Sequence, residues 1–460
     1  MHRWLSTLTV VLVTWGLVAA PARASDIEEI ADLADRMGIP GLAIRVDGPA
    51  GVENGYHRGV DGTGRRVDGV TPFVWGSVSK SIGARVAVDL ADGGELDLDH
   101  AVTAIIPAAE SWVGGDVTVR DLIRHTSGLV HDVALTDVTR PGPARTAVAQ
   151  MPKPERGSRG AFAYSSLNYI LLQAVVESVT GASYTDIVER RIGAPSGARV
   201  ISDAATFAAS VPAGHVPFFT RARAVRPAFD GAGLGYGYLA GSVDALAAYA
   251  RWLARDPRWS VFPTVPTGHG ADYGPGLYRE TIGGQELWWH SGAVPGYFTH
   301  MAVIPGSGRS FVMVVNRYGE LESQRYADLA RYLMLRFAGE TPSLPSAGTI
   351  WSIPVAGSLV VGLGGLAVAW AAIQLVRRRG SVSRRWGRSR AAGAVVGCGI
   401  VAAAAWFGPA ATGFPREVLD RWAPDVAILL TVLAVESVAL GVLVLLGTAT
   451  GRRSKAVLGG

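Results

Sequence analysis

Cysteine is almost absent from this chain: of its 460 residues only Cys398 is a cysteine, and it lies in an apolar stretch near the C-terminus. Residues 1–350 therefore have no thiol for a disulfide, a nucleophile or a cysteine zinc site. Metal-ligand patterns are also lacking, since none of the nine histidines belongs to an HExxH motif or a similar pair. The sequence predicts a domain that is stabilised by packing alone and has no metal centre.

A basic surface is lacking once the chain is divided into two parts. Residues 351–460 hold 12 Lys and Arg against 4 Asp and Glu, whereas the whole chain holds 43 against 38. This leaves 31 against 34 in residues 1–350, so the positive net charge of the chain comes from its C-terminal part. A mildly acidic domain without a basic patch excludes nucleic acid as the expected partner.

The chain begins with a segment typical of an export signal. Two basic residues precede an apolar run at residues 8–20, and the run is followed by Ala-Arg-Ala, a pattern that a signal peptidase accepts. We expect residues 1–24 to be a signal peptide and the mature protein to begin at Ser25. The alternative is an uncleaved signal anchor, but the short apolar core and the small residues after it favour cleavage.

Three long apolar stretches lie near the C-terminus. Residues 350–376 contain no charged residue and, at about 1.5 Å per residue, are long enough to cross a hydrocarbon core of about 30 Å. Residues 391–414 and 426–450 are almost as apolar, and Glu436 is the exception in the last of them. We predict three transmembrane helices. A charge in mid-span costs about 2.5–3.5 kcal/mol on insertion scales, so Glu436 should face protein, either a neighbouring span or a partner.

Basic residues are distributed unevenly around these spans. Seven arginines lie in residues 377–390, and three basic residues lie in residues 451–460. Both segments should therefore be cytoplasmic. The loop 415–425 and the large N-terminal region then lie outside, as the signal peptide independently requires. The sequence thus predicts an extracytoplasmic domain at residues 25–340, a linker at 341–349 and a location in the cell membrane, and it leaves open self-association or a partner through the spans.

The extracytoplasmic region begins and ends with alternating strands and helices around a helical middle. The expected elements are a helix at 26–37, a strand at 41–46, a helix from the SVSK segment to residue 91, mainly helices over 95–258, strands at 286–289, 298–304 and 310–315, and a helix at 323–337. This order predicts one sheet built from both ends of the chain, with a helical lobe inserted between them, and hence an α+β fold.

Ser77 and Lys80 are the residues whose spacing suggests chemistry. They are three apart at a helix start, so their side chains lie about one turn apart on one face. A serine hydroxyl is a poor nucleophile until a base takes its proton, and a lysine can do so when burial lowers its pKa toward neutrality. The helix N-terminus adds backbone N–H groups and a positive potential beside the reacting oxygen. S-x-x-K alone is weak, because most occurrences are a surface serine and a solvated lysine.

Four blocks of sequence give this pair a specific context. They are FVWGSVSKSIGA around Ser77, VTVRDLIRHTSGL at 117–129, FAYSSLNYILL at 162–172 and HSGAVPGY at 290–297. In this order they resemble the serine β-lactamase-like superfamily, which includes penicillin-binding proteins, class C β-lactamases, DD-peptidases, D-aminopeptidases and related esterases. The resemblance covers residues 26–340. It implies a β-lactamase/transpeptidase-like fold, in which helices flank an antiparallel sheet, followed here by the three transmembrane helices.

By this resemblance Tyr164 matches the tyrosine of the family's Tyr-x-Asn element, whose phenol relays a proton between nucleophile and leaving group. The Asn of that element is replaced by Ser166, which we also assign to the substrate site. Ser166 is shorter and lacks the amide that would hold a substrate carbonyl and orient Lys80. Asn168, two residues onward on a new helix, should point elsewhere. The replacement of Asn by Ser166 therefore makes peptides and β-lactams less favourable as substrates.

The segment His290-Ser291-Gly292 matches the family's Lys-Thr-Gly strand. Ser291 would contact the substrate, and the backbone N–H of Ala293 would form the oxyanion hole with that of Ser77. The cationic Lys of this element is replaced by His290. With an unperturbed pKa of about 6.5 this residue would be mostly neutral at pH 7 and would charge when the pH falls. We therefore expect better activity on neutral esters than on penicillins or D-Ala-D-Ala peptides.

Five further residues stand in the matching blocks or near them. We expect His125 to have a structural role, Tyr236 and Tyr238 to line or cover the cleft, and Trp288 and Trp289 to pack in the sheet.

Two functions follow from these observations. The first is a serine hydrolase in which Ser77 attacks an ester or amide, Lys80 accepts its proton, Tyr164 relays the proton and water releases the acyl group. It needs no cofactor and takes a small-molecule or peptidoglycan-derived substrate. The second is a non-catalytic sensor or scaffold that binds a wall fragment in the same pocket. The three intact residues favour the first function. The choice among ester, D-amino-acid peptide and β-lactam stays open, as does the question whether the spans only anchor the enzyme.

Overall fold

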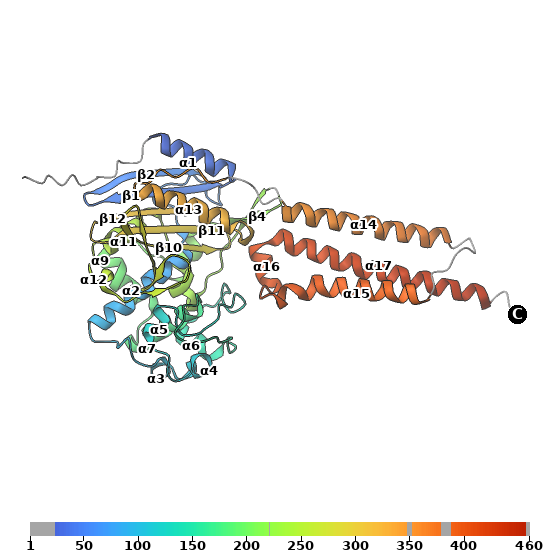
Figure 1. Ribbon diagram of the computed structural model, residues 1–460, viewed down its shortest axis with the longest axis horizontal. Coiled ribbons are helices and arrows are strands. Elements are labelled where there is room, and N and C mark those ends of the chain that lie inside the picture. The colour runs from blue at the N-terminus through green and yellow to red at the C-terminus, as the bar shows by residue number, and fades with distance from the viewer. Residues whose placement is uncertain (1–23, 220, 347–351, 379–387, 457–460) are drawn as a thin grey trace, which may run out of the picture.

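The computed structural model describes residues 24–219, 221–346, 352–378 and 388–456 (Figure 1). Most of the predicted signal peptide and of the basic segment 377–390 lies outside these residues, as do parts of the linker and of the C-terminal segment 451–460.

One eight-stranded antiparallel sheet forms the centre of the domain, and it is built from both ends of the chain, as predicted. Residues 41–48 pair with residues 309–315 as the second and third strands of the sheet, so residues about 270 positions apart lie side by side. In sheet order the strands are β2 (Gly51–Gly59), β1 (Gly41–Gly48), β12 (Arg309–Val315), β11 (Tyr297–Ile304), β10 (Gln285–Val294), β9 (Tyr278–Ile282), β8 (Asp272–Tyr273) and β7 (Val265–Pro266).

Two helices cover one face of this sheet. They are α1 (Ala24–Arg36) and α13 (Ser323–Phe337), the second with the predicted bounds. Leu33 of α1 and Leu329 of α13 are buried in the same apolar cluster as Leu42 and Met313 of the sheet. The alternating pattern of β1 therefore fixes which face receives these helices.

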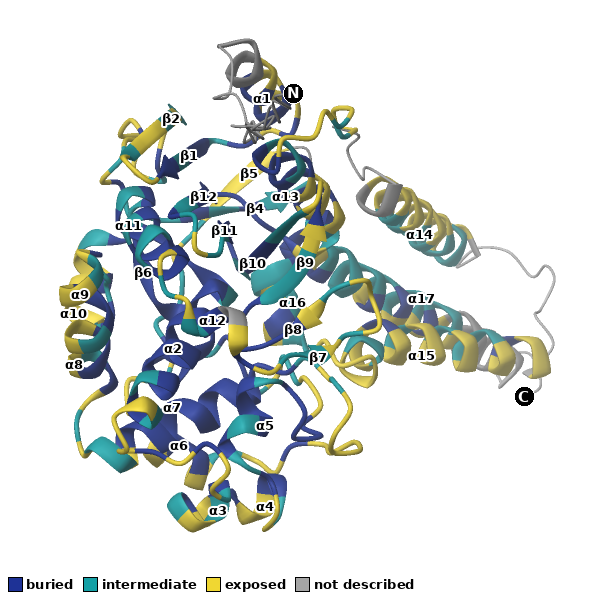
Figure 2. Cartoon of the chain, turned by 60° about the vertical axis from the view of Figure 1, so that its left-hand side comes forward, coloured by how far each residue is buried: buried dark blue, intermediate teal, exposed yellow. Residues whose placement is uncertain are grey.

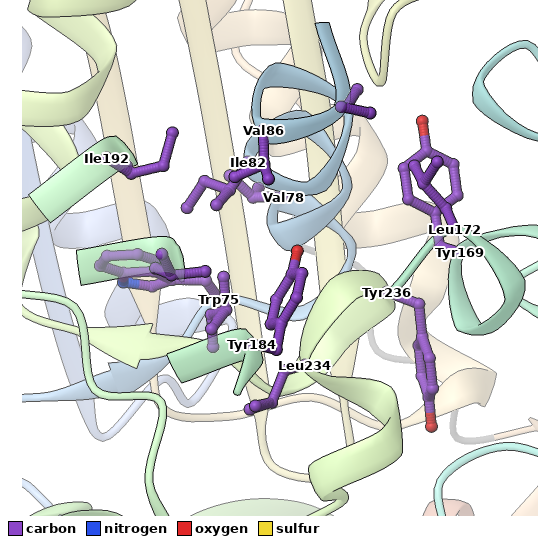
Figure 3. Close-up of a cluster of buried hydrophobic side chains, with 14 of the residues drawn as sticks. Trp75, Val78, Ile82, Val86, Tyr169, Leu172, Tyr184, Ile192, Leu234 and Tyr236 are labelled. Atoms are coloured by element: carbon purple, nitrogen blue, oxygen red, sulfur yellow. The ribbon is translucent and has the colours of Figure 1, made fainter. Parts of the chain in front are cut away.

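The other face packs against α2 (Ser79–Asp92) and α11 (Val243–Ala254), with α7 (Leu167–Thr180) behind them. The Ser242 hydroxyl accepts a hydrogen bond from the Ala245 N–H at 3.1 Å, so Ser242 is the N-cap of α11. Helix α2 lies at the centre of the domain and is buried on almost every side (Figure 2). Figure 3 shows Val78, Ile82 and Val86 within its apolar cluster. The apolar burial of α2 holds the segment that begins with Ser77.

The inserted lobe contains short helices and several irregular connections. Its helices are α3 (Val102–Ile105), α4 (Glu110–Val113), α5 (Val119–Ile123), α6 (Ala144–Gln150), α8 (Tyr184–Val188), α9 (Ala194–Ser196) and α10 (Ala204–Ser210). The mainly helical middle also contains β4 (Gly214–Phe218) and β5 (Arg221–Val225), which form a hairpin that was not predicted. Residues 51–59, for which no strand was predicted, form the edge strand β2. These strands are defined by their pairing with other strands, and this pairing cannot be predicted from the composition of polar or glycine-rich segments.

The C-terminal part consists of α14 (Ser352–Arg378), α15 (Arg388–Ala411), α16 (Arg416–Trp422) and α17 (Pro424–Ala456). By length and composition three described segments could cross a membrane: Val355–Arg377, Ser389–Ala411 and Pro424–Leu446. They overlap the three predicted spans and carry much exposed apolar surface (Figure 2). The short helix α16 lies in the loop expected on the outside.

Glu436 of α17 faces α14, which confirms the expectation that it faces protein. A Cβ added at Gly364 would lie 2.5 Å from Glu436 Oε2, and one added at Gly365 would lie 3.1 Å from Oε1. The carboxyl group therefore packs against glycine backbone, where a larger residue on α14 would displace it.

We expect Glu436→Leu to have opposite effects on insertion and on packing. Removal of the charge should favour insertion of the isolated segment by about 2.5–3.5 kcal/mol, because the unpaired charge carries that cost. In the full-length protein the variant should lower the thermal unfolding temperature in detergent, because the branched side chain does not fit against Gly364. Insertion assays and thermal unfolding test the two effects, with Glu436→Gln as the isosteric control. Unchanged insertion and unchanged unfolding would contradict this role.

Candidate active site

Ser77 lies in a single 3-10 turn, η1 (Gly76–Val78), directly before α2. Gly76 has φ 53°, and a Cβ there would lie 2.4 Å from the backbone nitrogen of Ala293. A Cβ at Gly292 would lie 2.1 Å from the carbonyl oxygen of Trp75. Glycine at both positions allows the turn and β10 to approach each other closely, and this approach places Ser77 beside the edge of the sheet.

The amine of Lys80 contacts Ser77, as the spacing predicts. Lys80 Nζ lies 3.0 Å from Ser77 Oγ, 3.2 Å from Ser166 Oγ and 2.9 Å from the backbone carbonyl oxygen of Tyr236. The side chain is fully buried. Its three polar contacts come from three separate elements, so the amine is held in one position next to the serine hydroxyl.

Burial lowers the pKa of Lys80 to about 7, and the nearby negative charge of Asp137 opposes this shift. At neutral pH a large fraction of the amine is therefore unprotonated and can accept a proton from Ser77. A solvated lysine with a pKa near 10.4 would be protonated almost completely. The structure thus places a base of suitable strength within hydrogen-bond distance of the serine.

The phenol of Tyr164 lies close to Ser77 and influences the same site. Burial raises the pKa of Tyr164 well above its ordinary value, and the neighbouring Ser77 side chain opposes this only in part. The phenol therefore stays protonated at neutral pH. Its ring lies near the amine of Lys80, with 4.9 Å between Nζ and the ring centroid. This group can pass a proton on, whereas Lys80 remains the base.

Strand β10 presents a free edge to this site. Its first half pairs with β9 from Gln285 to Trp289, whereas the described pairing beyond Trp289 is with β11 alone. The edge from His290 to Ala293 therefore runs past Ser77 without a second neighbouring strand. An extended substrate can lie along such an edge, in the place that the resemblance assigns to it.

His290 is neutral in this structure, but for a different reason than expected. Burial and, to a lesser extent, the charge of Lys80 lower the pKa of His290 to about 3. The expectation that His290 would become charged near pH 6.5 was therefore wrong, because that value applies to a solvated ring. Its Nδ1 donates to the carbonyl oxygen of Ser291 at 2.5 Å, and its Nε2 lies 3.4 Å from the Tyr273 hydroxyl.

Hydrogen bonds determine the orientation of His125 as well. Its Nδ1 accepts from the Ser165 N–H at 3.2 Å and lies 3.1 Å from Asn168 Nδ2, so Nε2 carries the proton and donates to the Tyr273 hydroxyl at 3.3 Å. The Tyr273 hydroxyl can then donate to His290. His125 connects the lobe to the sheet through these bonds, in agreement with the structural role expected for it.

Ser166 contacts Lys80 directly, which corrects the expectation that the shorter side chain would lose this contact. Its backbone N–H donates to His131 Nδ1 at 3.3 Å. Asn168 points elsewhere, as expected: its Oδ1 accepts from Ser127 Oγ at 2.5 Å, away from Lys80. The serine thus orients the lysine, and the asparagine holds the lobe.

The two tyrosines of the GLGYGYLAG segment, which were expected to line the cleft or cover it, lie inside the domain. Tyr236 and Tyr238 are both buried. The Tyr236 hydroxyl donates to Asp230 at 3.0 Å and accepts from the Asp137 N–H at 2.8 Å, while the Tyr238 hydroxyl donates to Asp137 at 2.8 Å. Figure 3 shows the Tyr236 ring directed away from α2. Their contribution to the site is the Tyr236 backbone carbonyl.

Asp137 and His300 were missed by the sequence reasoning. Asp137 is buried near Lys80, and burial raises its pKa to about 6. His300 Nδ1 lies 2.9 Å from Ser291 Oγ, and burial lowers its pKa to about 3. Neither residue belongs to a recognisable motif, so only the three-dimensional structure reveals them. Trp288 is buried in the sheet, and Trp289 stacks on Tyr278 at 4.6 Å, as expected of packing residues.

The described part of the chain contains no group of three or more His, Cys, Asp or Glu side chains that could hold a metal ion. The groups next to Ser77 are instead an amine, two hydroxyls and a strand edge. This arrangement can activate a hydroxyl and receive an acyl group.

Comparison with known proteins agrees with this geometry. The family model described as Beta-lactamase matches residues 28–335. The chain belongs to the beta-lactamase family. Within the wider superfamily of serine β-lactamases and penicillin-binding proteins, this family contains serine hydrolases, and the β-lactamase/transpeptidase-like fold expected from the sequence is confirmed.

Two curated relatives and one solved structure illustrate the similarity of this beta-lactamase-family chain. Penicillin-binding protein 4 of Amycolatopsis lactamdurans is 29% identical over an alignment of 348 residues that covers 65% of this chain and 86% of that protein. A D-aminopeptidase of Cereibacter sphaeroides is 27% identical over 285 residues, 58% of this chain but only 53% of that protein. The octameric penicillin-binding protein homologue from Pyrococcus abyssi has a TM-score of 0.57 at 22% identity, covering 70% of this chain and 78% of that one.

We expect kcat/KM for a neutral ester to rise with pH through an apparent pKa near 7 and then to level off. Below this pH Lys80 is protonated and does not accept the proton of Ser77. Lys80 and Asp137 interact, so the measured value belongs to the pair. Initial rates on p-nitrophenyl acetate between pH 5 and 9 test this expectation, corrected for uncatalysed hydrolysis. A value of kcat/KM that is still rising steeply at pH 9 would contradict the assignment of a buried lysine as the base.

Proposed function

We propose that this chain is a membrane-anchored, extracytoplasmic serine hydrolase that acts on an ester or amide through an acyl-enzyme on Ser77. The observation that carries the proposal is the fully buried amine of Lys80, 3.0 Å from the serine hydroxyl and with its pKa lowered to about 7. A scaffold that only bound a ligand would have no use for such a strong displacement of a lysine pKa, which is typical of catalytic sites.

Acylation begins when neutral Lys80 takes the proton of Ser77. The serine oxygen then bonds to the substrate carbonyl carbon, and the negative charge that develops on the carbonyl oxygen is held by the backbone N–H groups of Ser77 and Ala293. When the bond to the leaving group breaks, Tyr164 passes the proton from Lys80 to the departing oxygen or nitrogen. A water molecule later attacks the ester carbon, and release of the acid restores the serine hydroxyl.

The membrane location is supported by the three apolar helices at the C-terminus. Arginines between the first two spans favour a cytoplasmic loop there, which puts the hydrolase domain on the outer side. The export signal predicted at residues 1–24 leads to the same orientation. An enzyme in this position meets substrates of the cell envelope, including peptidoglycan-derived ones.

The substrate we favour carries no carboxylate at the position next to β10. His290 stands where carboxylate-recognising relatives are expected to carry a cation, and burial keeps it neutral at physiological pH. Both of its ring nitrogens already have partners, in Ser291 and Tyr273. Similarity to penicillin-binding and D-aminopeptidase proteins supports ester or amide substrates without settling between them.

Covalent labelling tests the nucleophile. A fluorophosphonate probe should attach to Ser77, and Ser77→Ala should abolish both labelling and turnover, because the acyl bond forms on this oxygen. Lys80→Ala should slow acylation by about 10²–10⁴-fold through loss of the base. Peptide mapping by mass spectrometry identifies the labelled residue, and a fluorescent penicillin distinguishes penicillin recognition from general serine reactivity. Labelling of another serine would overturn the assignment.

Replacement of His290 tests the substrate preference. His290→Lys should lower KM for a carboxylate-bearing ester relative to its neutral methyl ester by about tenfold, the effect of one charge-assisted hydrogen bond. In the wild type the same KM ratio should not vary between pH 5 and 8, because His290 stays neutral in this range. A wild-type ratio that already favours the acid, or that improves toward pH 5, would contradict this interpretation.

A further inference from the structure

The short helix α16 contacts the hydrolase domain directly, beside the hairpin that contains β4 (Figure 1). The ring of Trp422 packs edge-on against Tyr318, with 5.8 Å between centroids. Asp425, buried at the start of α17, accepts a hydrogen bond from the backbone N–H of Phe219 at 3.1 Å. The segment between the last two apolar helices is thus docked by an aromatic contact and a buried polar one.

Arg421 makes the contact nearest to the active site. Its guanidinium donates a hydrogen bond to the backbone carbonyl of Asp137. Asp137 has φ 55° and Phe219 has φ 51°; with His125 they are the non-glycine residues of positive φ in the described part of the chain. This conformation is sterically unfavourable for residues other than glycine and persists where surrounding contacts enforce it. Two of the three such residues are held by the α16–α17 segment.

Asp137 in turn belongs to the surroundings of Lys80. Its N–H donates to the Tyr236 hydroxyl, its carboxylate accepts from the Tyr238 hydroxyl, and the Tyr236 carbonyl accepts from the Lys80 amine. A continuous chain of contacts therefore runs from Arg421 through Asp137 and Tyr236 to the amine.

The same residues are coupled by charge. The charged or titratable groups that face Asp137 are Tyr164, Tyr236, Tyr238, Asp230, Lys80 and Arg421. Burial raises the pKa of Asp137, and the positive charges of Lys80 and Arg421 oppose this shift. The negative charge of Asp137 in turn opposes the lowering of the Lys80 pKa by burial. Loss of the positive charge of Arg421 would leave Asp137 less ionised and Lys80 more easily deprotonated.

We propose that Arg421 is a positioning residue of the active site: by holding the backbone at Asp137, the helix between the last two apolar segments fixes the surroundings of Lys80. The C-terminal helices then complete the hydrolase site as well as anchoring it. This inference rests on the proposed function, and it assigns a role to a part of the chain beyond residue 335, where the match to the family ends.

The experiment compares Arg421→Gln with the wild type as full-length protein in detergent. We expect kcat/KM for p-nitrophenyl acetate to fall about tenfold or more, because small displacements of a catalytic group are costly. The acidic limb of the pH profile should move to lower pH. Amide hydrogen exchange in peptides covering residues 131–139 should accelerate. Arg421→Lys keeps a positive charge and a hydrogen-bond donor. The acidic limb of its pH profile should therefore stay near the wild-type position, and its kcat/KM should lie between those of Arg421→Gln and the wild type.

The matched control is Asp420→Asn, which changes an exposed charge on the same helix and should leave all three measurements unchanged. The proposal would be overturned if Arg421→Gln kept the wild-type kcat/KM, the wild-type pH dependence of kcat/KM and the wild-type amide exchange rates. A lower unfolding temperature without a shift of the limb would also overturn it, since this is the result for a purely structural contact. If Arg421→Gln does not fold, Arg421→Met, which keeps the aliphatic stem but has neither charge nor donor, takes its place with the same expected and contradicting results. If the wild type hydrolyses no ester, the proposed function fails, and the exchange rates alone decide whether Arg421 orders the loop.

Discussion

Lys80 places a primary amine in the fully buried centre of the domain, and most of the site depends on how that amine is accommodated. An unpaired ammonium there would be very costly, so the group loses its proton near neutral pH and is surrounded by polar partners. Each partner comes from a different element: Ser77 from the turn before α2, Ser166 from the start of α7, and the Tyr236 carbonyl from the segment after the β4–β5 hairpin. The amine can act as a base only where these three elements meet.

The sheet determines where that meeting point lies. β1 from one end of the chain pairs with β12 from the other, and β11 and β10 follow β12 in the sheet. Because β9 pairs only with the first half of β10, the second half has a free edge beside Ser77. Glycine at positions 76 and 292 permits a backbone approach that any side chain would prevent. Packing therefore brings together a nucleophile, the neighbouring amine and a strand edge beside which a substrate can lie.

Local patterns in the sequence predict much of this arrangement. The one-turn spacing of Ser77 and Lys80 predicts their contact, the alternation in residues 41–46 predicts a strand, and the N-cap Ser242 predicts the start of α11. The strands at 51–59 and 214–225 were not predicted, because their pairing depends on distant partners and not on their own composition. The pKa of His290 could not be predicted either, since it follows from burial against Lys80 and not from the type of residue.

The central claim, a buried Lys80 with a pKa near 7, has a direct measurement because the sequence contains only three lysines: Lys80, Lys153 and Lys455. In protein labelled with lysine that carries ¹³C at the ε carbon, each side chain gives its own titrating NMR signal. The account predicts one signal that titrates near pH 7 and is altered in Ser77→Ala. Three signals that all titrate above pH 9 would contradict it.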